Sequence, residues 1–199
     1  MRDVAPPPLR IRDPKIMRAL AHPARMAILE YLMTDGPATA TECAEVVGQS
    51  PSATSYHLRA LAKVGLVEEA PSRGDGRERL WQTYEYGLEL DADAVNDPLA
   101  RAAEKDLIAV LLDRQFAKVN AWYESSLAEG EEWRDAAAFT ESRLLMTSAE
   151  MGELQRAIAS LINPYRFRSR KPDPPAGART VTSIFYLFAD PEVASRDVK

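Results

Sequence analysis

The chain has 199 residues, of which 46% are hydrophobic and 28% are charged, a composition typical of a globular protein with one large or two small domains. Its net charge is −5, and its one cysteine excludes an internal disulfide framework and favours a reducing, cytoplasmic location. No apolar run reaches the roughly 18 residues of a transmembrane helix, and residues 1–8 lack the apolar core of a signal peptide, so no membrane partner is expected.

Residues 1–13 are predicted to form a flexible N-terminal arm, because three consecutive prolines at 6–8 favour an extended backbone. Asp13 followed by Pro14 is a helix-start signal, since the aspartate accepts free N–H groups and the proline has no N–H to leave unpaired. A first short helix is expected from there to Leu20.

His22 and Pro23 separate this helix from the next, because proline disfavours helical geometry in the residue before it. His22 is interpreted as a helix cap or a packed side chain rather than a ligand. The second helix is expected to end near the Asp-Gly-Pro sequence of residues 35–37. Its predicted core side chains recur at helical spacing: Met26 or Ala27, Ile28, Leu29 and Leu32.

Residues 39–64 contain two helix signatures back to back. Thr39 and Glu42 have the spacing of a capping box, and Gly48 lies where a helix ends in a left-handed residue. Ser50 and Pro51 then start a second helix that runs through residue 64. The apolar stripe of the first helix is Cys43, Val46 and Val47. A tight turn between two short helices is the helix-turn-helix geometry, whose second helix enters the DNA major groove.

The second helix of this pair has two distinct faces. The face predicted to be buried carries Thr54, Leu58 and Leu61, with Ala53 and His57 at its margin. The opposite face is polar and cationic, and it carries Ser52, Ser55, Tyr56, Arg59 and Lys63. Such side chains donate hydrogen bonds to base edges and phosphates, although the same pattern also describes an ordinary solvated helix.

A hairpin follows, with strand candidates at residues 66–70 and 77–84 and turn residues at 71–76. This hairpin exposes Arg73, Arg77 and Arg79 near its tip. After a recognition-type helix, such a hairpin is interpreted as a wing that contacts phosphates or a minor groove, rather than as a plain surface hairpin. The arginines of the N-terminal arm either reach a minor groove or stay in solvent.

The chain resembles the ArsR-type winged-helix repressors over residues 14–84. Residues 19–32 are similar to the opening helix pair of that family, residues 50–61 to its recognition helix, and residues 76–81 to its second wing strand. The resemblance implies a dimeric transcriptional regulator, usually a repressor released from its operator by a small effector. It also implies a DNA-binding set that comprises Ser50, Ser52, Ser55, Tyr56, Arg59, Lys63, Arg73, Arg77 and Arg79.

Metal sensing is not expected. Many relatives of this kind bind metals through cysteines at the start of the helix before the recognition helix, and Thr39 and Thr41 stand there instead. A hydroxyl is a poor soft ligand. Cys43 lies on the buried stripe, where a lone cysteine acts as a small apolar residue. No histidine follows position 57, so a histidine–carboxylate zinc site on a C-terminal helix is also unexpected. No cofactor, metal or catalytic group is predicted.

A long helix is predicted from Asp97 and Pro98 to about Leu127. Its predicted apolar side holds Leu99, Ala103, Leu107, Val110, Leu111, Val119, Trp122 and Tyr123. A helix of this length needs a packing partner, and a two-fold dimer seam is the favoured one, with packing inside the chain as the alternative.

The last third of the chain is predicted to be a small strand–helix–strand module. Strand candidates at residues 143–146 and 180–188 flank a helix that starts at a second capping box, Thr147 and Glu150. The basic run 166–171 either touches nucleic acid or marks a solvated helix end. The aromatic residues of this region are candidates for core or for an effector pocket: Trp122, Tyr123, Trp133, Phe139 and Tyr186.

The predicted fold class is therefore mainly α (α+β): an arm at 1–13, a winged helix-turn-helix domain at 14–88, and a dimerisation and effector-binding region at 89–199. The predicted function is a homodimeric regulator, most simply a repressor, that binds double-stranded DNA at an inverted repeat and responds to a small molecule of unidentified class. Residues 1–90 hold 11 Lys and Arg against 12 Asp and Glu, and this near-neutral balance favours the alternative, a winged-helix protein-interaction scaffold. An enzymatic role ranks third.

Overall fold

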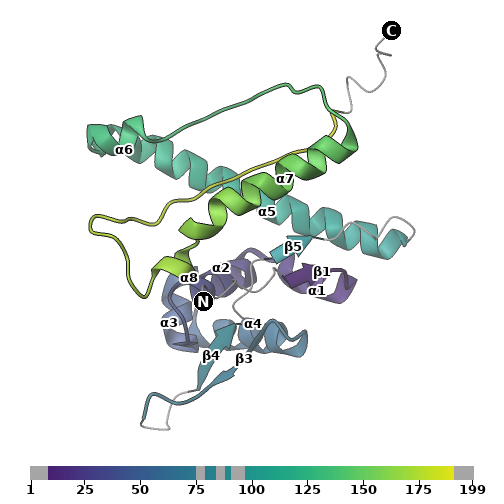
Figure 1. Ribbon diagram of the computed structural model, residues 1–199. Coiled ribbons are helices and arrows are strands. Elements are labelled where there is room, and N and C mark those ends of the chain that lie inside the picture. The colour runs from purple at the N-terminus through teal and green to yellow at the C-terminus, as the bar shows by residue number, and fades with distance from the viewer. Residues whose placement is uncertain (1–8, 75–78, 84–87, 91–96, 191–199) are drawn as a thin grey trace, which may run out of the picture. The chain divides into compact units, whose positions relative to one another are not determined.

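The computed structural model describes residues 9–74, 79–83, 88–90 and 97–190 (Figure 1). The chain divides into two compact units, residues 1–127 and residues 128–199, and each is described by itself. Among the described residues, no helix is both long and apolar enough to cross a bilayer.

The N-terminal part of the first unit differs from the prediction. Strand β1 (Leu9–Ile11) pairs in parallel with β5 (Leu88–Leu90), and Ile11 is 1% exposed. These residues were expected in a flexible arm. They are ordered because a later segment supplies a hydrogen-bonding edge and the core accepts the isoleucine, and neither can be seen in the local sequence. Residues 1–8 lie outside the described residues.

Four helices follow in the predicted places. They are α1 (Pro14–Leu20), α2 (Pro23–Thr34), α3 (Ala40–Val47) and α4 (Pro51–Lys63). Asp13 caps α1 by accepting the N–H of Lys15, and His22 caps α2 through its imidazole. At α3 the predicted capping box forms in both directions: Thr39 accepts the Glu42 N–H, and Glu42 accepts the Thr39 N–H. The start signals in the sequence are thereby confirmed.

A three-stranded antiparallel sheet completes the winged helix. It consists of β2 (Ala38–Thr39), β3 (Val67–Ala70) and β4 (Leu80–Thr83) in the order β2-β4-β3. The hairpin register places Val67 opposite Thr83 and Ala70 opposite Leu80. The two wing strands are confirmed, with β3 beginning one residue later than predicted and β4 beginning at Leu80; residues 77, 78 and 84 of the predicted second strand lie outside the described residues. Strand β2 was not predicted, and it forms because β4 offers it an edge beside the start of α3.

One hydrophobic core holds the first unit together. Its fully buried side chains come from every helix of the unit and include Met17, Leu20, Ile28, Leu29, Leu32, Cys43, Leu58, Leu61 and Leu107. Each predicted core residue of α2 is buried except Ala27, for which Met26 was the stated alternative. Val46 was predicted on the buried stripe of α3 but is 48% exposed, because the face of α3 that meets the core carries Cys43, Ala44 and Val47 instead.

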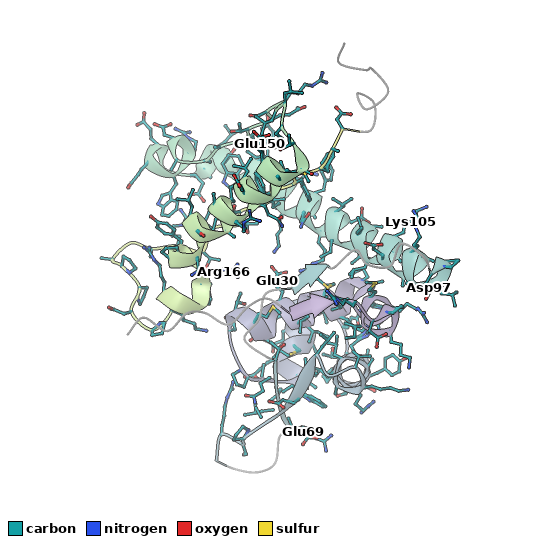
Figure 2. All side chains as sticks on the ribbon, turned by 45° about the vertical axis from the view of Figure 1, so that its right-hand side comes forward. Glu30, Glu69, Asp97, Lys105, Glu150 and Arg166 are labelled. Atoms are coloured by element: carbon teal, nitrogen blue, oxygen red, sulfur yellow. The ribbon has the colours of Figure 1, made fainter. Side chains whose placement is uncertain are left out.

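The long helix is α5 (Pro98–Ser125), followed by the 3-10 turn η2 (Ser126–Ala128). It packs against α1 through Ala100, Ala103 and Leu107. Glu30 on α2 also forms ion pairs with Arg114 and Lys118 of α5 (Figure 2). The predicted apolar residues do not share one environment, since Ala103 and Leu107 are buried in the core while Leu99 is 69% and Tyr123 is 72% exposed.

The second unit is built from α6 (Glu131–Asp135), α7 (Ser148–Ile162), the turn η3 (Asn163–Tyr165) and α8 (Phe167–Arg170). The second capping box is confirmed, since Thr147 and Glu150 bond reciprocally. The strand–helix–strand prediction is wrong, because residues 143–146 and 180–188 are not in strands. High β propensity makes a strand only where a neighbouring strand completes the ladder, and none does so here.

Arg179 ties the start of the C-terminal extended segment to α6. Its guanidinium donates two hydrogen bonds of 2.8 Å to the Glu129 carboxylate and lies 4.7 Å from the ring centre of Trp133. Of the five aromatic candidates for core or effector pocket, Phe139 is 66% and Tyr186 is 51% exposed, so these two are not core side chains.

Candidate nucleic-acid interface

The turn between α3 and α4 sets the angle of the recognition helix. Gly48 has φ +62°, a left-handed conformation that glycine adopts without strain, and its N–H donates to the carbonyl of Ala44. The Gln49 N–H donates to the same carbonyl at 3.1 Å. Ser50 then caps α4 by accepting the N–H of Ala53 at 3.3 Å. Three residues, 48–50, are therefore enough to end one helix and start the next.

One face of α4 is anchored in the core. Thr54, Leu58 and Leu61 are 0% exposed, as the helical spacing predicts. The Thr54 hydroxyl donates to the Ser50 carbonyl at 3.1 Å, so this buried polar group is satisfied within the helix. His57 was placed at the margin of this face but is 8% exposed and therefore part of it. These contacts leave α4 little freedom to rotate about its own axis.

The other face of α4 is open to solvent and has the predicted chemistry. Ser52, Arg59 and Lys63 are exposed, and Tyr56 is 65% exposed although it is a large aromatic side chain. Ser55 is half-buried at the edge of this face. The structure therefore brings five of the nine predicted contact residues together on one helical surface, and Ser50, exposed but occupied as a cap, adjoins it.

The wing arginines are placed differently from the prediction of a cationic tip. Arg73 donates to Glu42 at 2.9 Å and also to the Pro37 carbonyl, so it faces the start of α3. Arg79 pairs with Glu69 across the hairpin at 3.2 Å and lies over the ring of Trp81. Arg77 lies outside the described residues. Both pairs have exposed side chains, and such pairs contribute little to stability in water.

Electrostatics around α3 follow from these contacts. The backbone hydrogen bond from Thr39 lowers the pKa of Glu42, and Arg73 lowers it further against the opposing effect of burial. Burial raises the pKa of the Cys43 thiol to about 11, and the charge of Glu42 acts in the same direction. Cys43 is therefore a protonated, buried thiol at neutral pH, which suits a packing role and not a metal-binding thiolate.

The sequence interpretation missed one cluster beneath α4. His22, Arg25, Gln49 and His57 converge there from the α1–α2 junction, from α2, from the turn and from α4. The signal in the sequence was that the only two histidines of the chain both lie in the winged-helix part. Burial lowers the pKa of both imidazoles, and the positive charge of Arg25 lowers both further.

Comparisons with known proteins agree with this geometry. The family described as "helix-turn-helix domain" matches residues 20–70. The HTH-type transcriptional regulator NmtR of Mycobacterium tuberculosis is 45% identical over 51 residues, which are 26% of this chain and 42% of NmtR. The chain thus spans well under half the length of this curated relative.

Solved structures of similar fold have low overall similarity to the chain. The homodimeric winged helix-turn-helix DNA-binding domain of Mb0332 from Mycobacterium bovis, a possible ArsR-family transcriptional regulator, is 24% identical with a TM-score of 0.32. That match covers 50% of this chain and 76% of the Mb0332 fragment. RV1404 from Mycobacterium tuberculosis is 16% identical with a TM-score of 0.31, over 74% of this chain and 80% of RV1404. The family match and the local geometry together show that residues 20–70 form a helix-turn-helix domain, and this stretch is similar to part of the HTH-type transcriptional regulator NmtR.

Proposed function

We propose that the chain is a DNA-binding transcriptional regulator that acts as a homodimer at an inverted-repeat operator, most simply as a repressor. The observation that carries this proposal is the asymmetry of α4. One face is fully buried, while the other exposes Tyr56 with serine and cationic side chains beside a wing. A large aromatic side chain exposed on the second helix of a helix-turn-helix is positioned to contact bases in the major groove.

Each exposed residue of α4 has a proposed role. Tyr56, Ser52 and Ser55 donate to base edges, and Arg59 binds guanine O6 and N7 through its two-pronged guanidinium. Lys63, at the end of the helix, neutralises a phosphate. Ser50 and the free N–H groups at the start of α4 are suited to a second phosphate, since a helix N-terminus attracts anions.

The wing is proposed to contact DNA when its arginines leave their carboxylate partners and pair with phosphates. The ion pairs of Arg73 with Glu42 and of Arg79 with Glu69 are exposed, so they stabilise the free protein by at most about 1 kcal/mol each. A phosphate competes well for such a guanidinium because the new pair also releases counterions from DNA. Arg77 is proposed to join them at the flanking backbone or minor groove.

The homodimer is proposed to form through the exposed side of α5. Exposed apolar residues of α5 recur at spacings of four and seven residues, at Ile108, Leu112, Phe116 and Tyr123, and Leu127 of the turn η2 continues them. A second copy covers such a stripe by the same stripe in a two-fold arrangement. Two recognition helices then meet half-sites about 34 Å apart on one face of the duplex.

The division of labour along the chain is also part of the proposal. Residues 14–88 bind DNA, and residues 89–199 supply dimerisation and effector binding. Helix α5 belongs to the same compact unit as α4 and is ion-paired to α2 by Glu30. A change in how two copies of α5 pair therefore moves both recognition helices without an intervening flexible link.

Selection of bound sequences from a random duplex pool tests the proposal and yields the operator. Arg59→Ala is expected to weaken operator binding by about 1–3 kcal/mol and to relax base preference at one position. Arg101→Ala, which removes an exposed arginine from α5, is the matched control and should leave the affinity within about twofold. Measuring the affinity for random duplex at several salt concentrations distinguishes the proposed regulator from a protein-interaction scaffold. A scaffold is expected to show almost no binding and no dependence of affinity on salt.

A further inference from the structure

The two histidines of the chain form a close pair with tilted rings beneath the candidate recognition helix α4. His22 is the N-cap of α2, and His57 lies on the buried face of α4. Their ring centres are 4.6 Å apart, with the ring planes tilted by 48°. The pair is thus a direct contact between the α1–α2 junction and the helix that presents the candidate DNA-binding face.

An accepted hydrogen bond at His22 and burial of an unpaired ring nitrogen at His57 favour the neutral form of both rings. His22 Nδ1 accepts the N–H of Ala24 at 3.2 Å, which requires a free lone pair on that nitrogen. His57 Nε2 lies 3.0 Å from Gln49 Oε1, and since an amide oxygen only accepts, Nε2 carries the proton. His57 Nδ1 is buried and has no hydrogen-bond partner.

Protonation has a specific structural cost at each ring. A proton on His22 Nδ1 breaks the N-cap and places a positive charge at the start of α2, where the helix dipole opposes it. A proton on His57 Nδ1 creates a buried N–H without an acceptor. Two adjacent imidazolium rings also repel each other.

The charged and titratable neighbours of the pair do not relieve this cost. Arg25 on α2 adds a positive charge close to both rings, and Arg18 on α1 joins the cluster through its main-chain oxygen, which accepts from Arg25. Tyr56 on α4 and Gln49 in the turn complete the surroundings. Within the described part of the chain, neither imidazole has a carboxylate partner that would stabilise its charged form.

The pair also touches the candidate reading surface. The ring of Tyr56 meets His57 edge-on, with ring centres 5.8 Å apart, while the tyrosine itself is 65% exposed. A shift of His57 therefore moves both the axis of α4 and the aromatic side chain that stands on it.

We propose that the neutral His22–His57 pair positions the recognition helix, and that protonation of the pair weakens binding to DNA. This inference rests on the proposed function and adds a regulatory input to it. Both rings favour the neutral form when folded, so their stabilising contribution is complete above the ordinary imidazole pKa of about 6.5 and is lost as the pH falls below it. Mild acid therefore releases the operator.

The test compares the natural chain with the double variant His22→Asn, His57→Gln, which contains no histidine and keeps an efficient N-cap residue at the start of α2, since asparagine is a favoured cap. Binding to the selected operator duplex is measured by fluorescence anisotropy from about pH 7.5 to about pH 5.5 at constant ionic strength. Each linked proton changes Kd by at most about tenfold per pH unit. For the natural chain, Kd is expected to rise by about threefold to tenfold, and for the double variant by less than about twofold.

A second measurement does not depend on DNA. Urea unfolding followed over the same pH range is expected to show the natural chain losing stability below about pH 6.5 and the variant losing much less. The single variant His22→Asn is measured alongside, and it keeps the test valid if the His57 substitution prevents folding. If Kd changes with pH equally for the natural chain and the variants, the proposal is overturned, whatever the unfolding data show.

The outcomes also separate this inference from the proposed function. If the natural chain binds no duplex at any pH, the proposed function and the coupling to DNA both fail, and the unfolding data still decide whether the pair is a packing element sensitive to acid. If it binds with a Kd independent of pH, the proposed function stands and this inference falls.

Discussion

Replacing Leu107 by alanine tests the packing that joins α5 to the helix-turn-helix elements. Leu107 is 1% exposed in the shared core, on the side of α5 that meets α1. The change removes about three buried carbon atoms, worth about 0.8 kcal/mol each, and leaves a cavity that costs more because the surroundings relax only in part. We expect the free energy of unfolding to fall by about 3 kcal/mol.

Leu112 provides the matched control, since it is the same residue type on the same helix but is 45% exposed. Leu112→Ala should change the stability of the monomer by less than about 0.5 kcal/mol. Urea unfolding followed by circular dichroism at two protein concentrations makes the comparison, because loss of Leu112 also weakens the proposed dimer and that effect depends on concentration. If Leu107→Ala is as mild as Leu112→Ala at low concentration, the close packing of α5 on α1 is wrong.

Three further changes test other contacts of the first unit. Thr39→Ala breaks the capping box of α3 and should cost about 1 kcal/mol in thermal unfolding, whereas exposed Thr41→Ala should cost little. Cys43, buried with a pKa raised to about 11, should react with iodoacetamide at about pH 8 only after urea unfolds the chain, and rapid alkylation of the folded chain would refute its burial. Burial alone would raise the pKa of Glu30, but Lys118 and the neighbouring arginine of α5 hold it below its usual value. Its stabilising contribution is therefore present above the unfolded pKa and lost as the pH falls through the folded one, so Glu30→Gln should flatten the stability curve in acid, and an unchanged curve would contradict the ion pairs.

The elements whose causes are local were predicted best. Two capping boxes, at Thr39 and Thr147, and three proline-led starts, at Pro14, Pro51 and Pro98, each begin a helix in the structure. In each case a side chain satisfies N–H groups only two or three residues away, so the signal and its effect lie in the same short stretch of sequence. The recognition helix was predictable in the same way, because its two faces differ in chemistry.

The features that depend on distant partners were not predictable. The parallel pairing of β1 with β5 joins segments that are far apart in the chain, and the Glu30 ion pairs join two helices of similar separation in sequence. Periodicity showed that α5 has apolar residues but not which of them face α1. Leu99 and Leu107 are the same residue type on the same predicted side, yet Leu99 is exposed and Leu107 is buried. The failed strands at 143–146 and 180–188 have the same origin, because propensity describes a residue and a ladder requires a partner.

The placement of Arg73 and Arg79 shows how a correct motif can still mislead about its contacts. Turn chemistry predicted that the hairpin presents its arginines outward, and the hairpin formed, but Glu42 and Glu69 are close enough to pair with them in the free protein. Under the proposed function, this pairing accounts for how a domain with nearly balanced charge would bind DNA, because Arg73 and Arg79 are held by exposed carboxylates that a phosphate can replace. Glu69→Gln should therefore strengthen DNA binding modestly, by up to about 1 kcal/mol, because Arg79 no longer gives up a partner. Anisotropy measurements on random duplex would refute this account if the variant bound no more tightly than the natural chain at low salt.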